Sequence, residues 1–210
     1  MSRGATRAER AAPMSGDEVV EAAQLSVTHA TTLPVPPDDV WPWIVQMGWG
    51  RGGWYTARVV DLLLFPANGP SADRILPEHQ SLRVGDRVPD GPPETECWFT
   101  VVDVEEGRRL VLRSDSHLPL AWRRRGLAVV EWTWAFELRP LRAEGRVRTR
   151  LVFRWRARTQ PSWFTVLVRL LVVPADSFMS RSMFHGLRRR VTGSHQRRFL
   201  LPFEFGLHVG

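Results

Sequence analysis

Hydrophobic and polar residues alternate along several stretches of the chain, which is typical of strands with one buried face. The alternation begins over residues 25–31, returns as a hairpin over residues 98–113, and is longest over residues 127–138 and 147–157. Over 147–157, apolar side chains occupy one face and arginines the other. The pattern therefore predicts an antiparallel sheet with one apolar face and one charged face.

Helical spacing appears between and after these strands. Apolar residues recur at helical intervals over residues 40–48, after Asp38 or Asp39 as a cap, and again over 57–65. In the last third, Pro174 is expected to divide an apolar part, Ser162 to Val173, from a longer helix that begins near Ala175. This order predicts an α+β helix-grip fold, with two short helices after the first strand and a curved antiparallel sheet wrapped around a long C-terminal helix.

The chain of 210 residues fits one domain with tails. Residues 1–23 carry mixed charges and no apolar period, so we expect a flexible leader before a domain over residues 24–192. Residues 193–210 form a Phe-rich tail that is a candidate cover for an apolar opening. No segment near the start resembles a signal peptide, and the longest apolar run, Trp163 to Val173, is too short to cross a bilayer. We expect a cytoplasmic protein with no stable membrane insertion.

Aromatic composition points to a cavity between the sheet and the last helix. The chain has 10 Trp against a single Tyr, and so many tryptophans suggest walls around a space as well as a solid core. Simple core packing is the alternative for any one of them. The inward candidates on the strands and the last helix are Trp132, Trp134, Phe153, Trp155, Met179 and Met183.

The glycine-rich stretch over residues 48–55 must be a loop, because so many glycines exclude regular structure. It lacks the arrangement of a phosphate-binding loop and follows a helix instead of a strand. In the functional interpretation, Trp54 and Tyr55 lie at the pocket mouth and Arg51 meets an anionic group of a ligand. Arg51 is equally consistent with a surface or structural ion pair.

The net charge is +7, and every Lys or Arg position is an Arg. The arginine row over residues 146–156 is the best candidate for a nucleic-acid surface. Trp155, however, lies on the opposite face of that strand, so stacking and charge are not presented together. We expect the row to be solvated or paired with Glu131 and Glu137 across the sheet, and we expect no nucleic-acid partner.

Candidate chemistry is sparse. The single cysteine, Cys97, rules out an internal disulfide and is expected to exclude a cysteine-based zinc site, and the six histidines are too widely spaced to predict a metal site. We expect neither a metal nor another cofactor. Acid–base chemistry has two candidates, Asp176 on the helix face of Met179 and His117 near a loop. Asp176 is alternatively a cap for the helix after Pro174.

Several motifs resemble one superfamily. Residues 36–48, Pro-Pro-Asp-Asp-Val-Trp-Pro-Trp-Ile-Val-Gln-Met-Gly, and residues 52–55, Gly-Gly-Trp-Tyr, are similar to an uncharacterised bacterial branch of the START/birch-pollen-allergen-like superfamily, also called SRPBCC. Residues 75–80, Gly85-Asp86 and 179–186 agree with that resemblance. It implies a helix-grip fold with a deep apolar cavity, in which members bind lipids, sterols, polyketides or hormones and some cyclise or dehydrate the bound molecule.

Pattern and resemblance together favour binding of a hydrophobic or amphipathic small molecule, such as a lipid, a polyketide or an isoprenoid-like compound. The first alternative is a cyclase or dehydratase that acts on a polyketide-like substrate in the same cavity. The second is a protein associated with a membrane surface through residues 163–173 and the Phe-rich tail.

Overall fold

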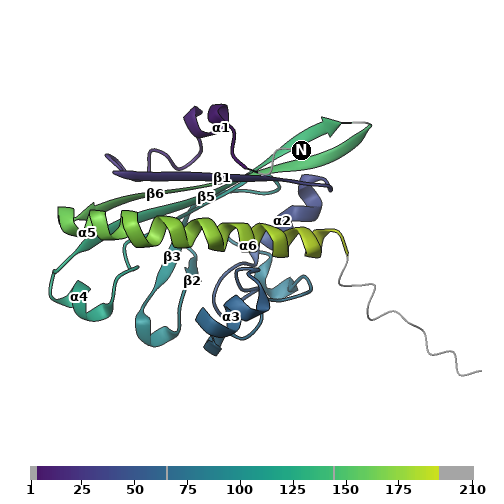
Figure 1. The fold of residues 1–210 in the computed structure, drawn as a ribbon. Coiled ribbons are helices and arrows are strands. Elements are labelled where there is room, and N and C mark those ends of the chain that lie inside the picture. Colours follow the sequence, from purple (N-terminus) through teal and green to yellow (C-terminus); the bar gives the residue numbers. More distant parts are fainter. Residues whose placement is uncertain (1–3, 65, 144, 194–210) are drawn as a thin grey trace, which may run out of the picture.

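A computed structural model describes residues 4–64, 66–143 and 145–193 of the chain; most of the Phe-rich tail, 194–210, lies outside the described residues. Six antiparallel strands form one curved sheet (Figure 1). Their order across the sheet is β1 (Leu25–Leu33), β6 (Arg146–Gln160), β5 (Val129–Ala143), β4 (Arg109–Ser114), β3 (Trp98–Glu105) and β2 (Arg87–Pro89). Period-two alternation thus located the strands, and the two longest extend beyond the predicted bounds because they pair with each other over all 15 residues.

Helices lie on both sides of this sheet (Figure 1). They are α1 (Arg7–Ala11), α2 (Pro37–Val45), α3 (Arg58–Leu64), α4 (Leu120–Arg124), α5 (Ser162–Leu167), a π-helical segment (Val168–Val172) and α6 (Val173–Val191). Short 3-10 turns occupy Pro66–Asn68, Pro77–His79 and Pro93–Thr95. The sheet curves around α6, which confirms the predicted helix-grip arrangement.

The prediction that Pro174 divides the terminal helix is wrong. From Ser162 to Val191 the chain is one continuous helix of 30 residues, made of α5, the π segment and α6. Proline lacks the N–H that would bond to the carbonyl four residues earlier, and the wider π turn that directly precedes α6 is where the helix adapts.

The inner face of the sheet and this helix form the main core. Alternate residues of the strands point toward α6, and Met183 and Leu187 meet them from the helix. The largest fully buried side chains on the strands of this face are Leu33, Phe99, Leu110, Leu112, Phe136, Leu151, Phe153 and Trp155. The predicted apolar face of the sheet is therefore confirmed.

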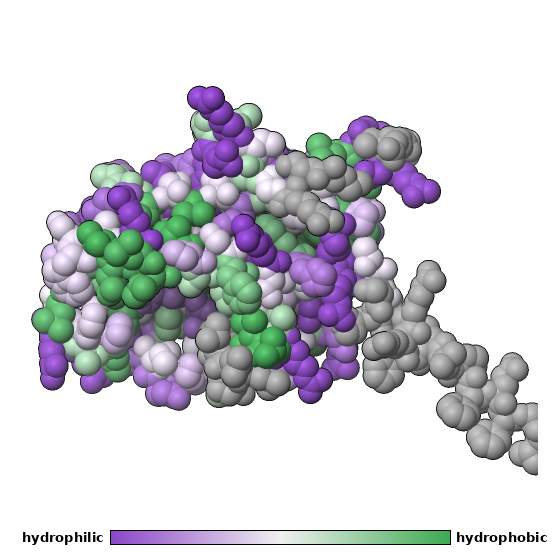
Figure 2. Space-filling model, viewed as in Figure 1, coloured by the Kyte–Doolittle hydropathy of each residue, from purple (hydrophilic) through white to green (hydrophobic). Residues whose placement is uncertain are grey.

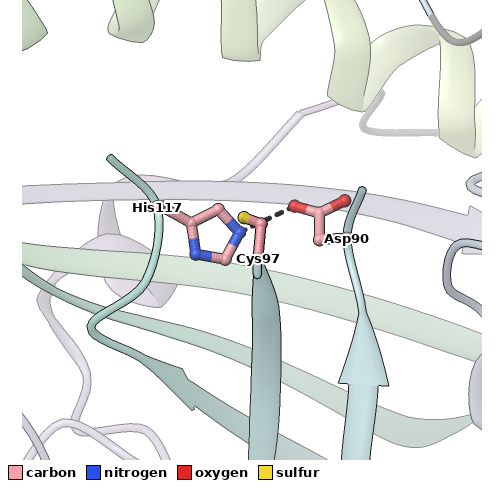
Figure 3. A group of neighbouring side chains, drawn as sticks. All are labelled: Asp90, Cys97 and His117. Atoms are coloured by element: carbon pink, nitrogen blue, oxygen red, sulfur yellow. Dashed lines mark hydrogen bonds and ion pairs between the residues drawn. The ribbon is translucent and has the colours of Figure 1, made fainter. Parts of the chain in front are cut away.

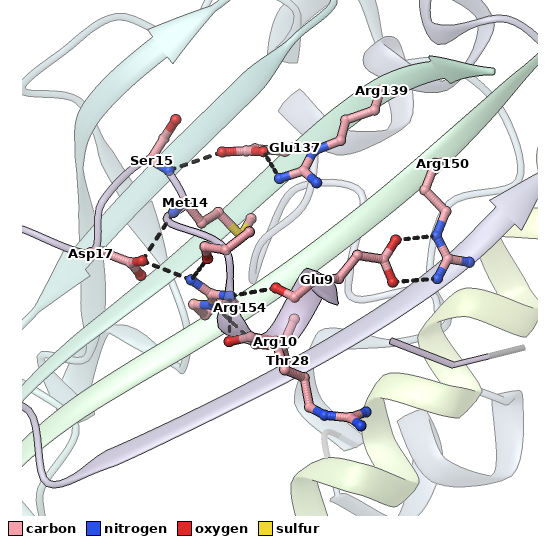
Figure 4. Close-up of polar contacts among 11 residues, drawn as sticks. Glu9, Arg10, Met14, Ser15, Asp17, Thr28, Glu137, Arg139, Arg150 and Arg154 are labelled. Carbon is pink, nitrogen blue, oxygen red and sulfur yellow. Dashed lines mark hydrogen bonds and ion pairs between the residues drawn. The ribbon is translucent and has the colours of Figure 1, made fainter. Parts of the chain in front are cut away.

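The prediction of a solvated arginine row is wrong for the centre of the outer face, although Arg146 at the end of the row is exposed. Residues of the N-terminal segment lie across this centre and pair with Arg150 and Arg154 (Figure 4). Arg150 forms two hydrogen bonds to the Glu9 carboxylate, at 2.6 and 2.7 Å, and Arg154 contacts Asp17 at 2.7 Å. Arg150 and Arg154 are buried beneath this cover.

From residue 4 onward, the expected flexible leader therefore packs against the sheet. Besides the ion pairs, Met14 packs into a small apolar cluster with Ala30, Val111, Ala135 and Val152 on the outer face. The side-chain hydrogen bond from Arg150, partly opposed by burial, lowers the pKa of Glu9 to about 2. Glu131 and Glu137, the expected partners of the row, contact other arginines: Arg113 and Arg158 for Glu131, and Arg139 for Glu137.

The long helix also has an exposed apolar side. By length and composition the stretch Ser162–Val191 could cross a membrane, which the sequence analysis missed because it ended the apolar segment at Pro174. Its inner side supplies buried Phe164, Val168 and Met183 to the core, while most of the apolar stretch is not buried in the protein. Hydrophobic residues gather near the α5 end of the molecule (Figure 2). The exposed ones on this helix are Trp163, Val166, Leu167, Leu170, Leu171 and Phe178.

Candidate functional site

A cavity of about 500 Å³ lies between the inner face of the sheet and the long helix. The strands supply its aromatic wall, the helix supplies the opposite wall, and the loop after α2 supplies an edge. It is lined by Trp54, Thr56, Asp90, His117, Trp132, Trp134, Phe153, Leu171, Val172, Ala175, Asp176, Met179, Ser180 and Met183. This volume is within the range of small-molecule sites, and its wall is apolar with a few polar groups.

Tryptophans dominate the strand side of the cavity. Trp132 stacks on Trp155 with 5.0 Å between ring centroids, and Trp134 meets Trp54 edge-on at 5.1 Å. The indole N–H groups of Trp54, Trp132 and Trp134 are buried and have no hydrogen-bond partner among the described residues. Because an unpaired buried donor costs free energy, these groups favour a ligand that carries acceptor atoms.

One ionisable pair joins β1 to α6 at the cavity. His29 Nε2 lies 2.6 Å from Asp176 Oδ2, and the Ser180 hydroxyl donates to the other oxygen of Asp176 at 3.1 Å. Asp176 lines the cavity, whereas His29 lies behind it. The alternative role of Asp176 as a helix cap is wrong, because the helix continues through this position and its carboxylate bonds to His29 and Ser180 instead of backbone N–H groups.

A second cluster forms where β2, β3 and β4 end or begin (Figure 3). Asp90, Cys97 and His117 each offer one ligand-type atom, and these atoms all lie within 4.8 Å of one another. His117 Nε2 is 2.8 Å from Asp90 Oδ2, and its Nδ1 is 2.7 Å from Ser114 Oγ. Burial lowers the pKa of His117, but hydrogen bonds to Asp90 and Cys97 outweigh it and raise the pKa to about 9.

The surrounding hydrogen bonds assign the protons of His117. The Ser114 hydroxyl donates its proton to the Trp98 carbonyl at 2.6 Å, so toward His117 it acts as an acceptor. The Asp90 carboxylate is likewise an acceptor. Both ring nitrogens of His117 therefore carry protons, and the ring is an imidazolium paired with Asp90.

The structure brings most of the predicted site residues together. Those that line the cavity are Trp54, Trp132, Trp134, Phe153, Asp176, Met179 and Met183. Trp155 does not line it, because the ring lies beneath Trp132 with no exposed surface.

Arg51 and Tyr55 also lie away from the cavity, contrary to prediction. The Arg51 guanidinium donates to the carbonyls of Met47, Val45 and His79, which ties the glycine-rich loop to α2 and to the turn at residues 77–79. The Tyr55 side chain is fully buried, and its hydroxyl donates to the Trp43 carbonyl at 2.7 Å. These contacts hold the loop, and with it Trp54, in place, and the Arg51 guanidinium is bonded to backbone carbonyls.

Sequence reasoning missed His29, Thr56, Asp90, Cys97 and Ser180 as site residues. For His29 a signal existed, since it alternates with Val27 on the inward face of the first strand. For Asp90 and Cys97 none existed. They are neighbours only because Pro89 pairs with Trp98 and the Asp90 N–H donates to the Cys97 carbonyl at 3.0 Å.

Comparisons with known proteins add little to this picture. No protein-family model matches the chain, and neither does any curated protein. Among solved structures, a conserved protein from Geobacillus kaustophilus is 12% identical, with 81% of this chain and 97% of that chain covered and a TM-score of 0.41. A protein from Nitrosospira multiformis is 13% identical, with 82% and 100% covered and a TM-score of 0.42. A polyketide-cyclase-like protein from Corynebacterium glutamicum is 13% identical, with 88% and 97% covered and a TM-score of 0.33.

Proposed function

We propose that the protein binds an apolar or amphipathic small molecule in the cavity between its sheet and its long helix. The observation that carries this proposal is the tryptophan wall, which combines a large apolar surface with unpaired indole N–H donors. Apolar surface favours a ligand with a hydrophobic body. The donors favour oxygen atoms on that body, as in an oxygenated lipid, polyketide or isoprenoid-like compound, instead of a pure hydrocarbon.

The test compares a plugged cavity with a matched control. Ala175 lines the cavity from the helix and has an exposed side chain, so Ala175→Trp fills space without removing a core contact. Ala8 on α1 is also exposed but lies on the other face of the sheet, so Ala8→Trp adds the same side chain elsewhere. Binding is measured by native mass spectrometry of co-purified small molecules and by titration with a fluorescent apolar probe.

We expect Ala175→Trp to lose the co-purified molecule and to weaken probe binding at least about tenfold, while Ala8→Trp binds like the native protein. Both variants should keep the native melting temperature within a few degrees. Equal binding by the native protein and Ala175→Trp would place the probe outside this cavity. Failure of the native protein to bind any compound of a lipid and polyketide panel would remove the proposal.

A catalytic role in the same cavity is the second candidate, and the Asp176 pair favours it. A carboxylate that faces an apolar cavity and is held by His29 and Ser180 is an arrangement suited to general acid–base catalysis, as in a cyclase or dehydratase. Asp176→Asn keeps the shape of the side chain and removes the base. The molecule that co-purifies with this variant should then be the unreacted substrate, which differs from the product by the mass of water for a dehydration and in chromatographic retention for a cyclisation. Identical co-purified molecules would count against catalysis by Asp176.

The exposed apolar side of the helix favours contact with an anionic bilayer surface. Its residues are continuous with the cavity, because Leu171 belongs to both, and exposed Arg169 lies among them beside the net charge of +7. Vesicle flotation tests this with Leu170→Glu against Val59→Glu, two exposed apolar positions of which only Leu170 lies on this face. We expect only Leu170→Glu to reduce binding to anionic vesicles. Absence of binding by the native protein at low salt would refute the membrane role.

A further inference from the structure

We propose that Asp90, Cys97 and His117 bind a transition-metal ion, with Zn²⁺ as the best match, in the wall of the cavity. This goes beyond the proposed function and does not depend on it. The three side chains offer a carboxylate oxygen, a thiol sulfur and an imidazole nitrogen, which are the donors that zinc takes in proteins.

The geometry needs little change to hold an ion. In a tetrahedral zinc site, bonds of about 2.0–2.3 Å place neighbouring donor atoms roughly 3.3–3.8 Å apart. Here all donor atoms lie within 4.8 Å of one another, and His117 Nε2 lies 2.8 Å from Asp90 Oδ2. Side-chain rotations on the order of 1 Å are therefore enough to surround an ion.

The backbone beneath the three residues is held by the sheet. Asp90 follows β2, Cys97 precedes β3, and the two are joined by the hydrogen bond between Asp90 N–H and the Cys97 carbonyl. His117 follows β4, whose last residue, Ser114, bonds to the Trp98 carbonyl on β3. Because paired strand ends fix the backbone of the three residues, the donor atoms are preorganised for metal binding.

Ser114 also orients the imidazole. His117 Nδ1 donates to Ser114 Oγ at 2.7 Å, which turns Nε2 toward Asp90 and Cys97. Histidine ligands of metals are commonly fixed in this way by a hydrogen bond to the other ring nitrogen. The hydrogen bond between His117 Nδ1 and Ser114 Oγ therefore supports a role of His117 Nε2 as a metal ligand.

The cluster has access from two sides. Asp90 and His117 line the cavity, and all three residues line a second hollow of about 720 Å³. An ion can enter through the second hollow. Three protein ligands leave the fourth position of a tetrahedral ion for a water molecule or for an oxygen of a bound molecule.

The net charge of the three side chains before binding equals the net charge of the zinc complex after two protons have been released. Before binding, the His117 imidazolium, the Asp90 carboxylate and the Cys97 thiol sum to zero charge. Zn²⁺ replaces the Nε2 proton of His117 and the thiol proton of Cys97, and both protons go to solvent. Afterwards the ion, one carboxylate, one thiolate and a neutral imidazole again sum to zero, so the partly buried site gains no uncompensated charge.

The experiment titrates metal-free native protein with Co²⁺, whose spectrum reports its ligands, and then adds Zn²⁺. We expect one Co²⁺ per chain, a thiolate-to-cobalt charge-transfer band in the near ultraviolet, and loss of both on addition of Zn²⁺. Calorimetry of Zn²⁺ binding at about pH 7, in two buffers of different ionisation enthalpy, should show release of about two protons.

Variants separate the ligands from their surroundings. Cys97→Ser should abolish the charge-transfer band, and His117→Gln and Asp90→Asn should each weaken metal affinity at least about tenfold. His29→Gln is the matched control, because His29 also pairs with a carboxylate beside the cavity but has no thiol nearby, and it should bind Co²⁺ like the native protein. Melting temperatures verify that each variant is folded.

Absence of a charge-transfer band at about millimolar Co²⁺, or its persistence in Cys97→Ser, would overturn the inference. The probe is the metal alone, so its outcome is distinct from that of ligand binding. A protein that binds the apolar probe but no metal keeps the proposed function and loses only the metal site.

Discussion

Gly186 lies where the long helix comes closest to the glycine-rich loop, and replacing it with alanine should destabilise the protein. A Cβ at this position would lie 1.9 Å from the Tyr55 carbonyl oxygen and 2.9 Å from its carbon. Ordinary contacts begin at 3.4 Å, so helix and loop must separate by about 1.5 Å. Both partners are backbone, and neither can rotate away as a side chain would.

The expected loss is about 2 kcal/mol of unfolding free energy. Overpacking typically costs about 1–3 kcal/mol, and a clash between two backbones belongs at the upper end of that range. Alanine returns about 1 kcal/mol through its higher helix propensity. For a domain of this size, the remaining loss corresponds to a fall in melting temperature of about 4–8 °C.

The assay is urea denaturation followed by tryptophan fluorescence, with probe binding measured on the same samples. Probe affinity should fall too, because Trp54 and Thr56 flank Tyr55 and line the cavity. His185→Ala is the control, since this neighbour on α6 is exposed and its truncation meets no backbone. If Gly186→Ala were as stable as the native protein, or more stable, the close packing of α6 against the loop would be refuted.

Two pH-dependent predictions follow from the buried groups. The pKa of Glu9 is lower in the folded state than its ordinary 4.5, so the stabilisation from its pair with Arg150 is present above about pH 4.5 and is lost as the pH falls toward 2. Hydrogen exchange of residues 4–20 should therefore accelerate over that range, and at neutral pH in Glu9→Gln; a rate that follows only the intrinsic chemistry would contradict this. Burial raises the pKa of Tyr55, the single tyrosine, above its usual 10, so tyrosinate absorbance should appear only together with alkaline unfolding. Absorbance that rises while the protein is still folded would show an accessible hydroxyl. Tyr55→Phe should cost about 1–2 kcal/mol, measured by urea denaturation, because the Trp43 carbonyl loses its partner.

Local patterns in the sequence determined most of the architecture. Alternation along residues 127–138 and 147–157 located the two central strands and their inward faces, because side chains of a strand point to opposite sides. The same reasoning identified Trp132, Trp134 and Phe153 as inward, together with Met179 and Met183 on the helix. Periodicity is a property of neighbours along the chain, so it can be derived from sequence alone.

Periodicity did not determine which inward residues face open space. Trp132 and Trp155 share the inner side of the sheet, yet only Trp132 lines the cavity, because its ring covers Trp155. Periodicity likewise predicted a solvated face for the arginine row over residues 146–156. What covers Arg150 and Arg154 is a segment more than 130 residues earlier in the chain, and its carboxylates carry no local signal of that contact.

The candidate metal cluster shows the same limit most clearly. Asp90, Cys97 and His117 have no ligand spacing along the sequence, and each follows or precedes a short strand without a recognisable pattern. Strand pairing brings Asp90 beside Cys97, and the turn after Ser114 brings His117 to both. The sequence by itself determined the elements and their faces, since these depend on local periodicity. Only the tertiary structure decided which side chains meet, since strand register and chain crossings join residues far apart in the sequence.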